Sequence, residues 1–233
     1  MTEAVRSSRE RSTRRIVIAG GHGKIALELE RLLSQRGDSV AGLIRNPDQA
    51  SDLAAAGAEA VVVDLEHSSV DEVAAHVRGA DAVVFAAGAG PGSGAARKET
   101  VDRAAAVLLA DAALAAGVGR YLMISAMGAD RRADDGASDP VFAAYLRAKA
   151  AADEEVLARD GLRTTVVRPG HLTDEPGTGR VSIAAKTGRG SVPRQDVAAV
   201  LVAVLDAPDT EGQTFELISG ETPIAGAVAA VGR

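Results

Sequence analysis

The feature that most constrains the fold is the junction between the first apolar run of the chain and a glycine-rich turn. The run Arg15–Ala19 leads directly into Gly-Gly-His-Gly at residues 20–23, and a segment with apolar residues at helical spacing follows. A turn of this kind between a buried strand and a helix leaves helical amides free and points the positive end of the helix dipole at a phosphate. We therefore expect Gly20 to permit the turn, Gly23 to let a diphosphate approach the backbone, and Ala26 to keep the helix close to the sheet.

The same alternation of short apolar runs and longer helical stretches continues along the chain. Strands are expected at residues 15–19, 39–44, 60–63, 82–86, 121–125, 164–167 and 214–218. Helices are expected at residues 24–35, 47–56, 70–77, 95–116, 141–160 and 194–205. This order predicts an α/β fold of Rossmann type, a doubly wound parallel sheet of about seven strands with helices on both faces and a small C-terminal substrate segment. We expect one NAD(P)-binding domain over residues 15–233, preceded by a disordered basic tail at residues 1–14.

Composition excludes several classes of function. The 233 residues carry a formal charge of −6 and only five aromatic side chains, which speaks against nucleic-acid binding. There is no cysteine, the four histidines are scattered, and no apolar run is long enough to span a membrane. We therefore expect a cytoplasmic protein without a metal site, a monomer or homodimer that acts on a small-molecule substrate.

The end of the second expected strand bears on which nucleotide is bound. NAD-preferring sites usually place an acid there, whereas this strand ends in Arg45, whose guanidinium suits a 2′-phosphate. A solvated loop arginine is the alternative interpretation. Asp64, followed by Leu65, is placed to accept a hydrogen bond from the adenine amino group, and residues 86–88 offer a small-residue wall for the adenine ribose. NADP is therefore the expected cofactor, with NAD as a possibility.

Three residues form a candidate catalytic group. Ser125 ends the fifth expected strand, and Tyr145 and Lys149 lie four residues apart in the helix that follows, so both lie on one helix face. A tyrosine needs a nearby cation to favour its phenolate near neutral pH, and Lys149 is placed to provide it. Ser125 would orient a carbonyl or hydroxyl, and Tyr145 would transfer the proton. The alternative is a surface tyrosine and a solvated lysine.

Further segments carry a resemblance to a known family. The turn spacing G-x-x-G-x-x-A resembles the G-A-T-G-x-I-G fingerprint of extended and atypical short-chain dehydrogenases/reductases. Residues 162–176 and 192–198 are similar to the L-x-x-T-I-V-R-P-G-x-L-T-D-x-P and I-x-R-x-D-V-A segments of the small atypical members, the NAD(P)H-binding or NAD-dependent epimerase/dehydratase-like proteins. The resemblance covers residues 14–231. It implies that Pro169, Gly170 and Leu172 flank the nicotinamide.

These patterns predict the cofactor-binding residues Gly20, Gly21, His22, Gly23, Lys24, Ile25, Arg45, Asp64, Leu65, Ala86, Ala87, Gly88, Lys149, Pro169, Gly170 and Leu172. The leading hypothesis is an NADP-dependent oxidoreductase that transfers hydride between NADP(H) and a small carbonyl, flavin or quinone-like substrate. The alternatives are a non-catalytic NAD(P)-binding regulator and a sugar-nucleotide epimerase or dehydratase. An epimerase would need a substrate lobe larger than the roughly 25 residues between the sixth strand and Arg194.

Overall fold

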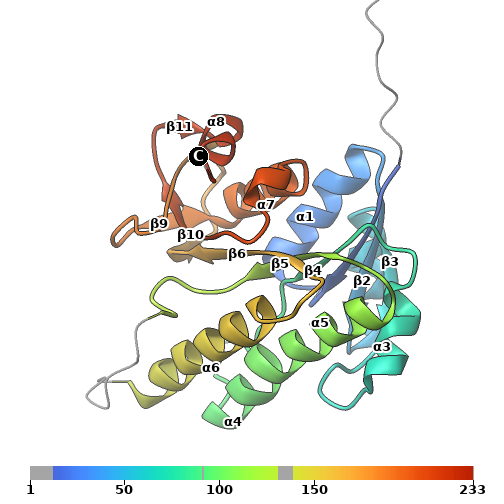
Figure 1. Ribbon diagram of the computed structural model, residues 1–233. Coiled ribbons are helices and arrows are strands. Elements are labelled where there is room, and N and C mark those ends of the chain that lie inside the picture. Colours follow the sequence, from blue (N-terminus) through green and yellow to red (C-terminus); the bar gives the residue numbers. More distant parts are fainter. Residues whose placement is uncertain (1–12, 91, 131–138, 233) are drawn as a thin grey trace, which may run out of the picture.

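A nine-stranded sheet with helices on both faces forms the protein (Figure 1). The computed structural model describes residues 13–90, 92–130 and 139–232. In spatial order the strands are β11 (Thr222–Pro223), β8 (Arg180–Ala184), β10 (Thr214–Ser219), β6 (Arg163–Pro169), β5 (Arg120–Ile124), β4 (Ala82–Phe85), β1 (Arg15–Ala19), β2 (Ser39–Ile44) and β3 (Glu59–Val62). The seven strands from β10 to β3 pair in parallel, which confirms the expected core of the sheet. The strand order reverses between β1 and β4, the place where such sheets bind ligands at their carboxyl ends.

The helices divide into two layers. They are α1 (Lys24–Gln35), α2 (Ala50–Ala55), α3 (Val70–Val77), α4 (Ala95–Arg97), α5 (Ala105–Ala115), α6 (Pro140–Leu157), α7 (Arg194–Leu205) and α8 (Ile224–Ala229), with short turns η1 (Pro47–Gln49) and η3 (Pro208–Thr210). In Figure 1, α1 and α7 cover one face of the sheet, and α3, α5 and α6 cover the other. No helix among the described residues is long and apolar enough to cross a membrane.

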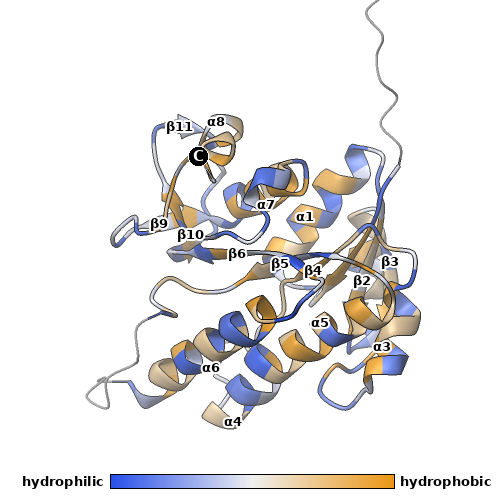
Figure 2. Cartoon of the chain, viewed as in Figure 1, coloured by the Kyte–Doolittle hydropathy of each residue, from blue (hydrophilic) through white to orange (hydrophobic). Residues whose placement is uncertain are grey.

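Alternating residues of the strands supply two hydrophobic clusters. Along β1, Ile16 and Ile18 pack toward α1 and α7, whereas Val17 and Ala19 pack toward α3 and α5. Hydrophobic residues are accordingly concentrated in the strands and on the inner faces of the helices (Figure 2). Because both faces are covered, the parallel strands are apolar throughout.

The sheet extends beyond the predicted seven strands. The segment after β6 forms β7 (His171–Thr173), β8 and β9 (Ser191–Pro193); β8 joins β10 antiparallel, and β7 pairs with β9 in a separate two-stranded sheet. These runs are only three to five residues long, so their strand conformation depends on partners distant in sequence.

The predicted helix at residues 95–116 is not uniform. Between α4 and α5 the chain forms η2 (Lys98–Ala104), a π-helical turn. Such turns are rare and often occur at functional sites, because they change which side chains face inward. Here Lys98, Val101 and Asp102 become buried.

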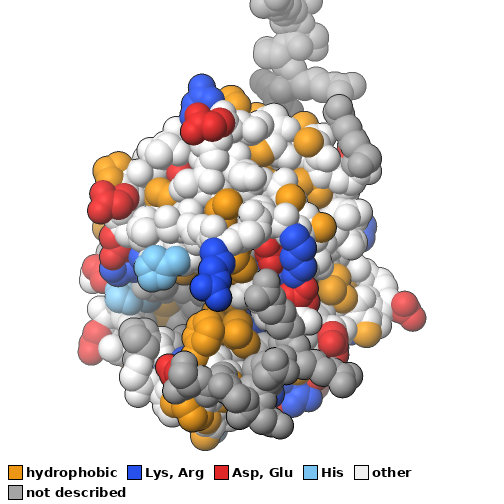
Figure 3. Space-filling model, turned by 90° about the vertical axis from the view of Figure 1, so that its left-hand side faces the viewer, with side chains coloured by type: hydrophobic (Ala, Val, Ile, Leu, Met, Phe, Trp, Pro, Cys, Tyr) orange, Lys and Arg blue, Asp and Glu red, His pale blue; other side chains and the backbone are white. Residues whose placement is uncertain are grey.

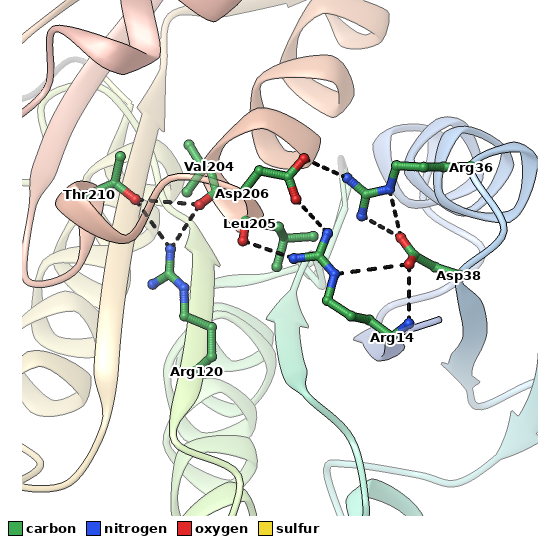
Figure 4. A network of polar contacts seen from close by, with 8 residues as sticks. All are labelled: Arg14, Arg36, Asp38, Arg120, Val204, Leu205, Asp206 and Thr210. Atoms are coloured by element: carbon green, nitrogen blue, oxygen red, sulfur yellow. Dashed lines mark hydrogen bonds and ion pairs between the residues drawn. The ribbon is translucent and has the colours of Figure 1, made fainter. Parts of the chain in front are cut away.

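The basic tail expected at residues 1–14 lies mostly outside the described residues, but Arg14 is part of the fold. Its guanidinium contacts Asp206 at 2.5 Å and the Leu205 carbonyl at 3.0 Å, and its amide donates to Asp38 (Figure 4). Arg36 joins Asp38 to Asp206 in the same network. The partners of Arg14 lie up to 192 positions away in the chain, which no local pattern reveals.

One buried residue conflicts with the amphipathic pattern of α1. Glu30 is fully buried, and neither carboxylate oxygen has a hydrogen-bond partner. It lies behind the glycine turn, because a Cβ placed on Gly42 or Gly21 would meet its Oε1 at 2.5 or 3.0 Å. Burial raises the pKa of Glu30 to about 8, so the carboxyl is protonated in the folded protein at neutral pH.

We expect Glu30→Gln to stabilise the protein increasingly as pH rises from 5 to 8. In that range the folded state retains a proton that the unfolded state has lost, so wild-type stability falls by up to about 1.4 kcal/mol per pH unit relative to the variant. Urea unfolding at several pH values measures this difference. Glu28→Gln, on the half-buried outer side of α1, is the control, and a pH-independent difference between wild type and Glu30→Gln would contradict the interpretation.

Candidate cofactor and active site

The glycine turn after β1 packs directly on two neighbouring segments. Gly20 has φ +78°, and a Cβ there would lie 2.6 Å from the Cα of Ala87 in the loop after β4. A Cβ on Gly21 would lie 2.8 Å from the Cα of Gly42 in β2. Both positions exclude a side chain, so the sequence requirement for glycine here comes from backbone packing as well as from the turn.

The amides available for a diphosphate lie around the start of α1. Gly20 and Gly21 donate to the carbonyl of Leu43, and Gly23 donates to the carbonyl of Gly20, so these three glycine amides are already paired. Within the described chain, the amides of residues 24–26 in the first turn of α1, and that of His22 just before its N-cap, have no hydrogen-bond acceptor.

Two cavities lie at the carboxyl edge of the sheet. The larger has a volume of about 590 Å³ and is lined by all three candidate catalytic residues together with Ile25 and Leu172. The smaller has a volume of about 200 Å³ and is lined by Gly20, Arg45, Asp64 and Leu65, among others. Ala87 and Gly88 line both cavities, and Ala86 lines the larger. The loop after β4 therefore separates two adjoining sites.

The other predicted cofactor residues line neither cavity. They are Gly21, His22, Gly23, Lys24, Pro169 and Gly170. The His22 ring contacts Asp52 at 2.7 Å, and Lys24 pairs with Asp174, which also binds Arg194.

Pro169 and Gly170 make backbone contacts instead. The Pro169 carbonyl accepts from the Met127 amide, and the Gly170 amide donates to the Leu217 carbonyl. These contacts fix the strand end that carries Leu172 into the larger cavity.

The three candidate catalytic side chains are held by groups that the sequence analysis missed. Ser125 is buried and donates its hydroxyl hydrogen to Asp153 Oδ2 at 2.8 Å. Lys149, also buried, donates to the Ile124 carbonyl at 3.2 Å and forms an ion pair of 3.3 Å with Asp102. Asp102 comes from η2 and Asp153 from α6, four residues after Lys149. The spacing of four on one helix face was a signal that could have identified Asp153.

These carboxylates alter the expected acid–base chemistry. Burial raises the pKa of Tyr145, and the charges of Asp102 and Asp153 raise it further. Burial lowers the pKa of Lys149, although both carboxylates oppose that change. The prediction that Lys149 lowers the pKa of Tyr145 is therefore wrong for the protein without bound cofactor, because Asp102 neutralises the lysine. Tyr145 stays a phenol, a hydrogen-bond donor.

A second missed group lies on the rim of the smaller cavity. Glu66 Oε2 contacts Arg45 at 2.9 Å and Arg97, from α4, at 2.6 Å, and Thr100 donates to the other oxygen. The Arg97 guanidinium holds the pKa of Glu66 below its usual range. One carboxylate thus holds two guanidinium groups beside the same cavity.

Comparison with known proteins agrees with this geometry. The model of a family described as NAD(P)H-binding matches residues 20–208. The chain belongs to this NAD(P)H-binding family. The match begins at Gly20. It includes the glycine turn and every residue that lines either cavity. The predicted resemblance to atypical short-chain dehydrogenases is confirmed.

Several known proteins match nearly the whole chain. "Uncharacterized sugar epimerase YhfK" of Bacillus subtilis (strain 168) is 39% identical over 215 residues, which is 92% of this chain and 98% of that protein. A Bacillus halodurans structure, provisionally named an NAD-dependent epimerase/dehydratase, has a TM-score of 0.84 at 35% identity and covers 92% of this chain and 98% of its own. The oxidoreductase ylbE of Lactococcus lactis has a TM-score of 0.80 at 25% identity, covering 93% and 96%.

The close packing of the family's glycine turn leads to a stability prediction. Gly20→Ala should lower the free energy of unfolding by about 1–3 kcal/mol, because alanine is strained at a positive φ and its Cβ meets the Ala87 backbone. Gly94→Ala is the control, since Gly94 has φ −67° and open space around it. Thermal and urea unfolding measure both variants, and equal stabilities would contradict the packing described here.

Proposed function

We propose that the protein is an NADP-dependent oxidoreductase of the atypical short-chain dehydrogenase type, which transfers hydride between NADP(H) and a small carbonyl, flavin or quinone-like substrate. The supporting observation is that Ser125, Tyr145 and Lys149 line one cavity of about 590 Å³, which adjoins a second cavity across Ala87 and Gly88. A dinucleotide consists of two nucleosides joined by a diphosphate. Two adjoining cavities beside the start of a helix match that shape.

The residues present fit such a cofactor. The four unpaired amides at the start of α1 would hold the diphosphate, and Asp64 and Leu65 would border the adenine in the smaller cavity. Ile25, Ala86 and Leu172 would border the nicotinamide in the larger one. When bound, the nicotinamide ring supplies or accepts the hydride.

The preference for NADP rests on Arg45. Its side chain is 57% exposed and makes one hydrogen bond to Glu66, which leaves further N–H groups free for a 2′-phosphate. Arg97 adds a second guanidinium on the same carboxylate oxygen. No acidic residue ends β2, where NAD-preferring sites usually have one.

Three side chains of the protein would transfer the proton and orient the substrate and the cofactor. Tyr145, whose pKa is raised, is the protonated group facing the cavity and would give its proton to the substrate oxygen during reduction. Lys149 would donate to the ribose hydroxyls, and its Nζ lies 6.0 Å from the Tyr145 ring centroid. The Ser125 hydroxyl donates its hydrogen bond to Asp153, so its oxygen would act as an acceptor for a substrate hydroxyl.

The cavity also favours an enzyme over the two alternatives. A regulator without turnover would be expected to fill this site with side chains, whereas Ser125 and Tyr145 border an open volume. A sugar-nucleotide epimerase would need a substrate lobe, whereas residues 171–193 form three short strands.

Cofactor preference is tested by binding. We expect NADP to raise stability by about 2.7 kcal/mol at one hundred times its Kd, and to bind more tightly than NAD. Arg45→Gln should weaken NADP roughly tenfold and leave NAD unchanged, because only NADP has the 2′-phosphate. Calorimetry measures both, with Arg103→Gln, whose partners are Glu99 and Glu155, as the control. Equal effects on NAD and NADP would remove the role of Arg45.

Catalysis is tested by steady-state oxidation of NADPH with aldehyde, ketone, quinone and flavin substrates. Tyr145→Phe should lower kcat by roughly 10²–10⁴ while the Kd for NADP stays unchanged. The matched control is Tyr121→Phe, because Tyr121 is buried and donates to the Ala106 carbonyl away from both cavities. Turnover by Tyr145→Phe at the wild-type rate would exclude a catalytic role for Tyr145.

A further inference from the structure

A buried cation lines the larger cavity and has no carboxylate partner among the described residues. Lys98, the first residue of the π-helical turn, is 8% exposed. Its Nζ donates to the Gly90 carbonyl at 2.9 Å, and no carboxylate oxygen of the described residues lies within 4.0 Å of it. A buried ammonium bound only to a neutral acceptor retains most of its desolvation cost, which an anion entering the cavity would reduce.

The neighbouring charges do not neutralise Lys98. Asp102, in the same turn, contacts Lys149 and accepts from the Ala89 amide. Asp139 lines the cavity mouth, but its carboxylate is used by the amides of Val141 and Phe142 at the start of α6. Neither carboxylate lies within 4.0 Å of Lys98 Nζ, so neither forms an ion pair with Lys98.

The same side of the cavity has an aromatic wall. The Tyr145 ring lies 5.5 Å from Lys98 Nζ, and its centroid is 6.0 Å from that of Phe142 at an angle of 34°. Phe142 and Val141 are 53% and 43% exposed, large values for apolar side chains. Figure 3 shows one face of the molecule, on which hydrophobic side chains gather in the lower half of the view, below several Lys, Arg and His side chains. Exposed apolar surface beside a cation suits a ligand that has both an apolar ring and a negative charge.

We propose that Lys98 is the anion-binding residue of the substrate site, and that the substrate is a planar aromatic or conjugated molecule that carries a carboxylate. The ring packs against Phe142 and Tyr145, and the carboxylate accepts hydrogen bonds from Lys98 Nζ. This proposal rests on the proposed function, because the carboxylate orients the substrate toward the Ser125, Tyr145 and Lys149 group. It narrows the substrate class to anions.

The test compares two probes of equal shape, 2-naphthoate and its neutral amide 2-naphthamide. Calorimetry on the protein saturated with NADP should show the acid binding roughly tenfold more tightly than the amide. Lys98→Met should remove that difference by weakening the acid alone, and Lys98→Arg should restore it in part. Lys186→Met is the matched control, because Lys186 pairs with Asp130 and does not line the cavity.

Three outcomes would overturn the proposal: equal binding of acid and amide by wild type, an acid preference that survives in Lys98→Met, or a loss of NADP affinity in Lys98→Met. The last would assign Lys98 to the cofactor. The same titrations without NADP separate the two proposals. If NADP does not bind, the proposed function fails, while the acid preference and its dependence on Lys98 still decide the role of Lys98.

Discussion

The contact between the glycine turn and the loop after β4 is the constraint on which the site depends. Gly20 lies against the Ala87 backbone with no room for a Cβ, and Gly21 lies equally close to Gly42. This packing brings the start of α1 to the point where the strand order reverses, and it makes the loop after β4 the wall between two cavities. A side chain at either glycine would separate these segments and with them the two cavities.

Buried charge sets the chemistry of the larger cavity. Lys149 is paired with Asp102 and Ser125 is bound to Asp153, so two of the three candidate catalytic groups are already engaged. Arg168 binds Asp153 from β6, which links this buried group to the sheet. Such groups are held in place by their partners, because an unpaired buried charge is far more costly than a paired one. Lys98 lacks such a partner among the described residues, and for that reason we propose it as the residue that binds the substrate carboxylate.

Much of the fold could be predicted because its signals are local. The strands Arg15–Ala19 and Ser39–Ile44 and the helices α1, α3 and α7 occur at the expected residues. Ser125 and the Tyr145–Lys149 pair were identified from their places in the expected elements, and they line the larger cavity, whereas Gly20 of the glycine turn lines the smaller one. The strands β7, β8 and β9 were missed because their conformation depends on partners elsewhere in the sheet.

The sequence by itself determined the alternation of strands and helices, the parallel core and the position of the phosphate turn, since hydrophobic period and glycine placement act over a few residues. Only the tertiary structure decided the ionisation of the site. Asp102 comes from a π-helical turn, Asp153 meets Ser125 from another element of the fold, and Glu66 joins two arginines from different segments. The pKa of a side chain depends on burial and on charges brought close by folding, and neither can be read from neighbours in the chain.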